Sequence, residues 1–134
     1  GGVCVESLND LLSKVDILSL HAKLTRENYH MLGKQQFQKV KKDLLLINCS
    51  RAELVDQDAL IEFINNGKIS AASLDVIEPE PPFDLNPVDH SYQHELLNHP
   101  KVIVTPHIGA STIEAQKRIS LNLAGQFQVF FNKL

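Results

Sequence analysis

Short runs of Val, Ile and Leu alternate along this chain with longer segments whose apolar residues recur at helical spacing. The apolar runs predict strands at residues 15–20, 44–48, 69–76 and 102–105, and a weaker strand at 2–5. Runs of this kind are typical of strands that are buried on both faces, as in a parallel sheet. Because helical segments separate them, we expect an α/β fold: an open parallel sheet with right-handed crossovers and helices on both faces.

Capping residues mark the predicted helices. The clearest helix, 56–66, begins on the possible N-cap Asp56 and is followed by Gly67, a common C-terminal stop. The final helix is predicted to begin at Ser111, which forms a capping-box pattern with Glu114. Its apolar residues recur at three-to-four spacing: Ile119, Leu123, Ala124, Phe127, Phe130 and Phe131. We expect its phenylalanines to lie in the core rather than at an interface.

Less regular parts of the sequence carry three further predictions. A short helix is expected after Ser7, which has an acidic residue three positions later. Residues 78–100 hold most of the prolines, and their apolar residues show no regular spacing, so we expect a long surface loop with one helical turn. Cys4 and Cys49 form no C-x-x-C motif, and we expect two reduced, partly buried thiols.

Composition narrows the possible functions. A chain of 134 residues with 43% apolar and 22% charged residues is typical of one globular domain that needs no disulfide or structural metal. The formal net charge of -3 and the single short basic cluster at 39–42 argue against a nucleic-acid partner. No apolar run approaches the ~18 residues of a membrane span, and no signal-peptide pattern is present, so we expect no membrane partner and a cytoplasmic location.

Polar side chains follow each predicted strand at the point where it ends. Ligands of open α/β sheets bind outside the carboxyl ends of the strands, so these residues should share one edge of the sheet. Each of them taken singly has a simpler explanation as a cap or a loop residue. The residues are His21, Ser50 with Arg51, Asp75 with Glu80, and His107.

This set suits proton-coupled hydride transfer or a hydrolysis. A His paired with a carboxylate is suited to general acid/base work, and Glu80 and His107 are candidates for that pair. Arg51 offers a planar charged fork that fits a substrate carboxylate. A metal site is not expected, because the histidines of the proline-rich loop lack Cys partners and an H-E-x-x-H helix. A serine hydrolase fits poorly, since neither Ser50 nor Ser111 lies in a G-x-S-x-G turn.

Four segments, taken in order and spacing, resemble a known family. They are VDILSLHAKLT (15–25), LLLINCSRAELVDQDAL (44–60), GKISAASLDVIEPEP (67–81) and TPHIGASTIEAQ (105–116). Together they resemble the second half of the nucleotide-binding domain of D-isomer-specific 2-hydroxyacid dehydrogenases, and the last segment is most similar to the D-3-phosphoglycerate dehydrogenase branch. The resemblance implies a partial Rossmann-like parallel sheet with helices on both faces.

The resemblance also implies a role for each matching residue. Arg51 would hold the carboxylate and carbonyl of a 2-oxo acid, Glu80 would pair with the catalytic histidine, and His107 would exchange a proton with the substrate oxygen. Asp75 would bind the nicotinamide carboxamide of NAD. The other residues expected to line the cofactor are Cys49, Ser50, Arg51, His107, Ile108, Gly109 and Ala110.

For the whole protein, the resemblance implies an NAD-dependent enzyme that interconverts a D-2-hydroxy acid and its 2-oxo acid, with 3-phosphoglycerate as the leading substrate and a homodimer as the expected assembly. The family's glycine-rich turn and substrate domain are not in this sequence, so residues 1–134 would be the C-terminal part of the nucleotide-binding domain. Two alternatives stay open: a corepressor-like module that binds nucleotide without catalysis, and a truncated chain with no activity of its own. The substrate side chain and the choice between NAD and NADP also stay open.

Four residues at three places depart from the family pattern. Ala52 stands where the family usually has Gly, and it would disturb catalysis if that position needs a positive φ. Lys23 replaces the usual Pro after His21, and Lys42-Asp43 stands where Pro-Gly commonly forms a turn.

Overall fold

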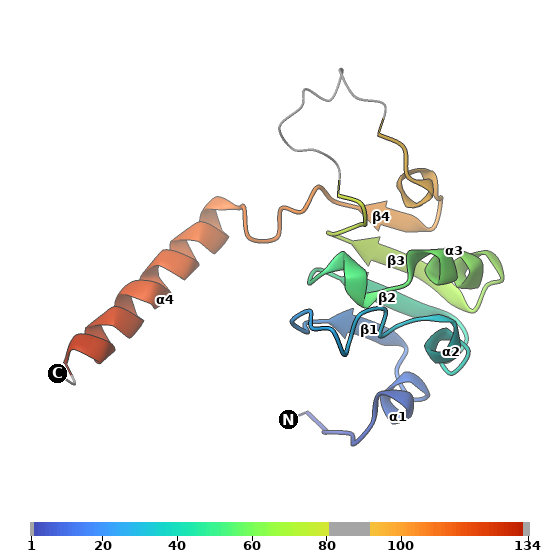
Figure 1. The fold of residues 1–134 in the computed structure, drawn as a ribbon, viewed down its shortest axis with the longest axis horizontal. Coiled ribbons are helices and arrows are strands. Elements are labelled where there is room, and N and C mark those ends of the chain that lie inside the picture. Colours follow the sequence, from blue (N-terminus) through green and yellow to red (C-terminus); the bar gives the residue numbers. More distant parts are fainter. Residues whose placement is uncertain (1, 81–91, 133–134) are drawn as a thin grey trace.

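A four-stranded parallel sheet forms the centre of the computed structural model, which describes residues 2–80 and 92–132 (Figure 1). The strands lie side by side in the order of the sequence: β1 (Ile17–Leu20), β2 (Leu44–Asn48), β3 (Ile69–Leu74) and β4 (Val102–Val104). The predicted α/β class, a partial Rossmann-like parallel sheet, is therefore confirmed. The weaker strand predicted at 2–5 is wrong, because these residues pair with no strand.

Helices connect the strands, and several begin where the sequence predicts. They are α1 (Leu8–Leu12), α2 (Lys34–Phe37), α3 (Gln57–Asn65) and α4 (Ile113–Phe131), with 3-10 turns η1 (Ala52–Leu54) and η2 (Glu95–Asn98). The Ser7 hydroxyl caps α1 and the Asp56 carboxylate caps α3, each by accepting a backbone N–H. Gly67 follows α3 with φ +78, so its role as a stop is confirmed.

Two helix predictions need correction. The N-cap of α4 is Thr112, whose hydroxyl accepts the backbone N–H of Ala115, rather than Ser111. Both serine and threonine can cap a helix. The backbone N–H of Ser111 instead closes a turn by donating to the carbonyl of Ile108, and the helix begins one residue later. The short helix α2 was not predicted, because four residues are too few to show a helical period.

The hydrophobic core lies between one face of the sheet and the helices α1, α2 and α3. Alternate strand residues point into it: Leu18 and Leu20 of β1 are buried, as are Leu44 and Leu46 of β2. The helices contribute fully or nearly fully buried side chains: Leu12, Phe37, Leu60, Phe63 and Ile64. This packing anchors the sheet and fixes where its carboxyl edge lies.

The opposite face of the sheet is open in the described part of the chain. Ile17 is 57% exposed, Leu45 40% and Ile103 67%, and with their neighbours they line a hollow of about 340 Å³. The expectation of strands buried on both faces is therefore wrong for these residues. The apolar runs arise because both faces carry apolar side chains, while the helices described here cover only one of them.

Helix α4 extends away from the sheet and buries none of its residues (Figure 1). Phe127, Phe130 and Phe131 are 60%, 59% and 63% exposed, so the prediction that they belong to the core is wrong. Their spacing indicates an apolar face, and periodicity alone does not identify what that face contacts. No helix among residues 2–80 and 92–132 is long and apolar enough to cross a membrane.

Candidate active site

The polar residues predicted at the strand ends lie along one edge of the sheet. Hydrogen bonds between neighbouring loops hold this edge together. The Ser50 hydroxyl donates to the carbonyl of Leu20 at 2.7 Å, and the backbone N–H of Asp75 donates to the carbonyl of Asn48 at 2.9 Å. The backbone N–H of Thr105 donates to the carbonyl of Leu74 at 2.9 Å. The loops after β1, β2, β3 and β4 are thus joined in strand order.

A buried amide shapes the turn that carries Arg51. Asn48, the last residue of β2, is 1% exposed. Its side-chain Nδ2 donates to the carbonyl of Arg51 at 2.9 Å, and its Oδ1 accepts the N–H of Ser50 at 3.0 Å. Sequence reasoning missed Asn48, although a polar residue that ends an apolar run is the available signal. By satisfying both groups, the amide fixes the backbone from which the Arg51 side chain projects.

Ala52 does not need the conformation that glycine would supply. It begins η1 with 6% exposure, and it is not among the residues with positive φ. The Arg51 guanidinium donates from Nη1 to the carbonyl of Ser50 at 2.7 Å and is otherwise exposed. The concern that Ala52 distorts this turn is therefore not supported by its backbone.

Asp75 binds the loop that follows β4. The carboxylate accepts the Thr105 hydroxyl at 2.5 Å and the backbone N–H groups of Ile108 and Gly109 at 3.0 and 2.9 Å. Asp75 is 6% exposed, and its burial disfavours the charged form. The hydrogen bonds from Thr105, Gly109 and Ile108 outweigh that burial and lower the pKa of Asp75 below its usual value. The loop therefore depends on an ionised carboxylate.

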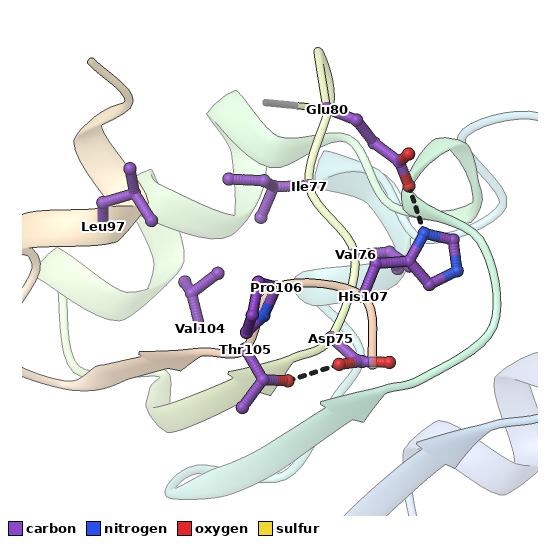
Figure 2. A pocket seen from close by; sticks show the side chains of 9 residues that line it. All are labelled: Asp75, Val76, Ile77, Glu80, Leu97, Val104, Thr105, Pro106 and His107. Carbon is purple, nitrogen blue, oxygen red and sulfur yellow. Dashed lines mark hydrogen bonds and ion pairs between the residues drawn. The ribbon is translucent and has the colours of Figure 1, made fainter. Parts of the chain in front are cut away.

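His107 sits at the bend of this loop and pairs with Glu80. Its φ of 51° lies in the left-handed region, which is rare for a residue with a side chain. The ring Nδ1 lies 2.7 Å from the Glu80 Oε1, and Figure 2 shows the carboxylate and the imidazole facing each other. Because Nδ1 is engaged with the carboxylate, Nε2 is the ring nitrogen left to meet a substrate.

The three residues predicted to act on the substrate line one cavity. Arg51, Glu80 and His107 border a space of about 330 Å³. A second cavity of about 130 Å³ adjoins the same Glu80 and His107, and its wall includes the apolar side chains of Ile77, Leu97 and Val104 (Figure 2). A cationic fork and an imidazole–carboxylate pair around one space are suited to bind a carboxylate and to move a proton beside it.

The remaining predicted residues differ in their placement. His21 follows β1, its Nε2 lies 2.8 Å from the Ser19 hydroxyl, and it does not line the cavity that Arg51 and His107 share. Cys49 and Cys4 are free and exposed, so the prediction of partly buried thiols is wrong. Ile108 is 45% exposed, and Gly109 and Ala110 are exposed as well. Among the residues expected to line NAD, Cys49 and residues 108–110 are exposed and Ser50 and His107 are half-buried, whereas Asp75 is buried and its carboxylate is engaged by the loop after β4.

The histidines weighed as metal ligands have other partners where the structure describes them. His94 binds the carbonyl of Glu78 and the N–H of Leu96, and His99 binds the Asn65 side chain. His90 lies outside the described residues. Within residues 2–80 and 92–132, no group of three His, Cys, Asp or Glu side chains is placed to hold a metal ion.

Comparison with known proteins identifies the family of the chain. Residues 1–109 match the sequence model of the NAD-binding domain of D-isomer specific 2-hydroxyacid dehydrogenases. The chain is 42% identical over 125 residues to D-3-phosphoglycerate dehydrogenase of Bacillus subtilis, and the aligned stretch covers 93% of this chain and 21% of that enzyme. It is 39% identical over 116 residues to hydroxypyruvate reductase of Thermotoga maritima, and this alignment covers 87% of this chain and 36% of that enzyme.

A solved structure shows the same fold. The pyruvate reductase of Chlamydomonas reinhardtii superposes with a TM-score of 0.77 at 35% identity, over 85% of this chain and 37% of that one. This chain thus spans between about a fifth and somewhat more than a third of the length of these relatives.

Proposed function

Because the chain belongs to the D-isomer specific 2-hydroxyacid dehydrogenase family through its NAD-binding domain, we propose that the protein reduces a 2-oxo acid to a D-2-hydroxy acid with NADH, and catalyses the reverse reaction. The observation that carries the proposal is the shared cavity of Arg51, Glu80 and His107. The finer proposal is that 3-phosphoglycerate and 3-phosphohydroxypyruvate are the substrate pair, which the similarity to D-3-phosphoglycerate dehydrogenases supports.

Each of the three residues has a distinct part in the proposed reaction. Arg51 binds the substrate carboxylate through its planar fork and orients the 2-oxo group. Protonated His107 donates a proton from Nε2 to the oxygen of that group as it becomes a hydroxyl. Glu80 accepts the Nδ1–H of the ring, which holds the ring orientation and leaves Nε2 to face the substrate. In the oxidative direction, neutral His107 takes the same proton from the hydroxyl.

The cofactor is NAD, and the loop residues at the carboxyl edge of the sheet fit it. Cys49 and Ser50 after β2, Asp75 after β3, and residues 107–110 would hold the nicotinamide end. When bound, NADH supplies the hydride that reduces the substrate carbon. The three hydrogen bonds from Thr105, Ile108 and Gly109 to Asp75 hold this loop at the sheet edge.

Residues 1–134 are proposed to be the C-terminal part of the nucleotide-binding domain of a larger enzyme. The greater length of the relatives supports this, as do the open apolar face of the sheet and the exposed apolar side chains of α4. Such surfaces are typical of contacts with further protein. The proposal includes a homodimer and a cytoplasmic location, in line with the sequence-based expectations.

The test is turnover by the protein that carries this chain, with NADH and a panel of 2-oxo acids. Arg51→Ala is expected to lower kcat/KM by about 100-fold to 1,000-fold, because about 3–4 kcal/mol of charge-assisted hydrogen bonding to the carboxylate is lost. The matched control is Arg26→Ala, which removes an exposed arginine outside the cavity and should leave kcat/KM unchanged within about 2-fold.

Comparison of substrates tests the finer proposal. The highest kcat/KM is expected for 3-phosphohydroxypyruvate, ahead of hydroxypyruvate and glyoxylate. Normal turnover by Arg51→Ala would refute the assigned role of the arginine. A change of assembly on adding NADH, with no turnover of any acid, would instead favour a non-enzymatic nucleotide-binding module.

A further inference from the structure

The position of Glu80 needs support beyond its contact with His107. Glu80 lies six residues after the end of β3 and outside any helix or strand. The side chains of His107 and Glu80 are 38% and 41% exposed. Ion pairs that exposed contribute only about 0–1 kcal/mol, too little to order a loop segment by themselves. Other contacts must therefore fix the backbone that carries the carboxylate.

The Gln57 side chain makes such contacts with the backbone two residues before Glu80. Its Nε2 donates to the carbonyl of Glu78 at 2.9 Å, and its Oε1 accepts the N–H of Glu78 at 3.2 Å. One amide thus satisfies both backbone groups of a single residue, as a neighbouring strand would. The pairing spans 21 positions in the sequence and joins helix α3 to the segment after β3.

Helix α3 is a firm support for this amide. Gln57 is the first residue of the helix, directly after the N-cap Asp56, whose carboxylate accepts the N–H of Ala59 at 3.0 Å. Leu60 and Ile64 of the same helix are fully buried in the core. The Gln57 backbone therefore moves only if the core moves, and its side chain transmits that rigidity to Glu78.

Two further side chains contact the same segment. The His94 Nε2 lies 3.1 Å from the carbonyl of Glu78, and the Tyr92 hydroxyl donates to the carbonyl of Pro79. With its Nδ1 accepting the N–H of Leu96, neutral His94 has its proton on Nε2 and donates to Glu78. Since the Glu78 carbonyl accepts from Gln57 as well, this short stretch is hydrogen-bonded by three side chains.

From these contacts we propose that Gln57 is a positioning residue for the reaction. It holds the Glu78 backbone so that Glu80 reaches Nδ1 of His107 and leaves Nε2 directed to the substrate. The catalytic consequence of this inference rests on the proposed function, whereas the hydrogen bonds between Gln57 and Glu78 are observed in the structure. Neither the strand-end pattern nor the family resemblance assigns a role to Gln57.

The test variant is Gln57→Met, which keeps the side-chain length and helix preference and removes both hydrogen bonds. Hydrogen exchange of the Glu78 amide is expected to accelerate about 10-fold, because its acceptor is lost. In turnover of the 2-oxo acid, kcat is expected to fall about 10-fold to 100-fold, while KM changes by less than about 2-fold because Arg51 is untouched.

The matched control is Asn65→Ala at the other end of α3. Asn65 accepts a side-chain hydrogen bond from His99 at 3.1 Å, so the control also removes one link from the same helix to a later segment. It should leave both the Glu78 amide and kcat unchanged. A purely structural effect of losing a surface link would instead lower kcat in both variants.

The possible outcomes separate the inference from the proposed function. Faster Glu78 exchange together with lower kcat in Gln57→Met alone supports the positioning role. Unchanged exchange, or faster exchange with unchanged kcat in an active wild-type protein, overturns it. A wild-type protein that reduces none of the acids overturns the proposed function, and with it the catalytic part of the inference, while the exchange data still report whether Gln57 holds Glu78.

Discussion

Replacement of Asp75 by Asn tests how the loop that carries His107 is held. The substitution keeps the size of the side chain and removes the charge that accepts hydrogen bonds from Thr105, Ile108 and Gly109. In the Asn variant, an NH₂ group replaces one of the two carboxylate oxygens and faces a backbone N–H of Ile108 or Gly109, to which it offers no acceptor. A hydrogen bond to a charged group contributes about 1.5–3 kcal/mol, but the loop is partly open to water, which replaces some of the lost partners.

We therefore expect Asp75→Asn to lower the free energy of unfolding by about 1.5–3 kcal/mol at pH 7, which equals roughly one strong hydrogen bond. For a chain of this length, that change corresponds to a fall in Tm of about 5–10 °C. The matched control is Asp58→Asn in the first turn of α3, where the carboxylate is exposed. Its expected cost is below about 0.5 kcal/mol.

The pH dependence of this difference has a definite sign. The pKa of Asp75 in the folded protein is lowered, so the charged carboxylate stabilises the fold at every pH above the unfolded value of about 4. That stability is lost as the pH falls through the lower pKa of the folded protein. The gap between wild type and Asp75→Asn should therefore be constant from about pH 5 to 7 and shrink below about pH 4.

Urea unfolding followed by circular dichroism at several pH values measures this gap. A difference below about 0.5 kcal/mol at pH 7 would show that the carboxylate does not hold the loop. A difference that persists undiminished at pH 3 would show that the charge on Asp75 is not the source of the stability.

Two further predictions concern the fold. Asp43→Gly should raise the free energy of unfolding by about 0.5–1 kcal/mol, because Asp43 has φ 68, a conformation that glycine adopts without strain. Asp58→Gly, inside α3, should lower the free energy of unfolding by about 1 kcal/mol. Thermal unfolding of the two variants checks that the changes have opposite signs. Leu60→Ala, at a fully buried position, should cost about 2–5 kcal/mol, while Leu121→Ala, at a position 63% exposed, should cost less than about 0.5 kcal/mol in the same assay, and equal costs would contradict the assigned core.

The elements that the sequence predicted well depend on local chemistry. The strands around Leu46 and Ile69 follow from apolar runs, and the caps Ser7 and Asp56 follow from side chains that bond the backbone three residues later. The one-residue error at Thr112 has the same local basis, since two hydroxyl residues compete for the cap. Such interactions join near neighbours in the chain, so their pattern is visible in the sequence.

The common edge of the candidate site was also predictable, for a topological reason. Parallel strands place their carboxyl ends together, so Arg51 and His107 had to lie along the same edge of the sheet. The pairing of Glu80 with His107 was inferred as a candidate from chemistry, and the distance of 2.7 Å between Nδ1 and Oε1 came from the structure. The roles of these residues in turnover remain the proposal that the variants above test.

By itself, the sequence determined the succession of strands and helices, the helix caps and the edge of the sheet where polar groups gather. Only the tertiary structure decided which face of the sheet the helices cover, that Phe127 is exposed, that Asp75 holds the loop of His107, and that Gln57 reaches Glu78. The first set follows from hydrogen bonds and periodicity within a few residues and, for the edge, from the common direction of parallel strands. The second depends on contacts between segments 20 or more positions apart or on what covers a surface, and a linear pattern does not specify which segments meet there.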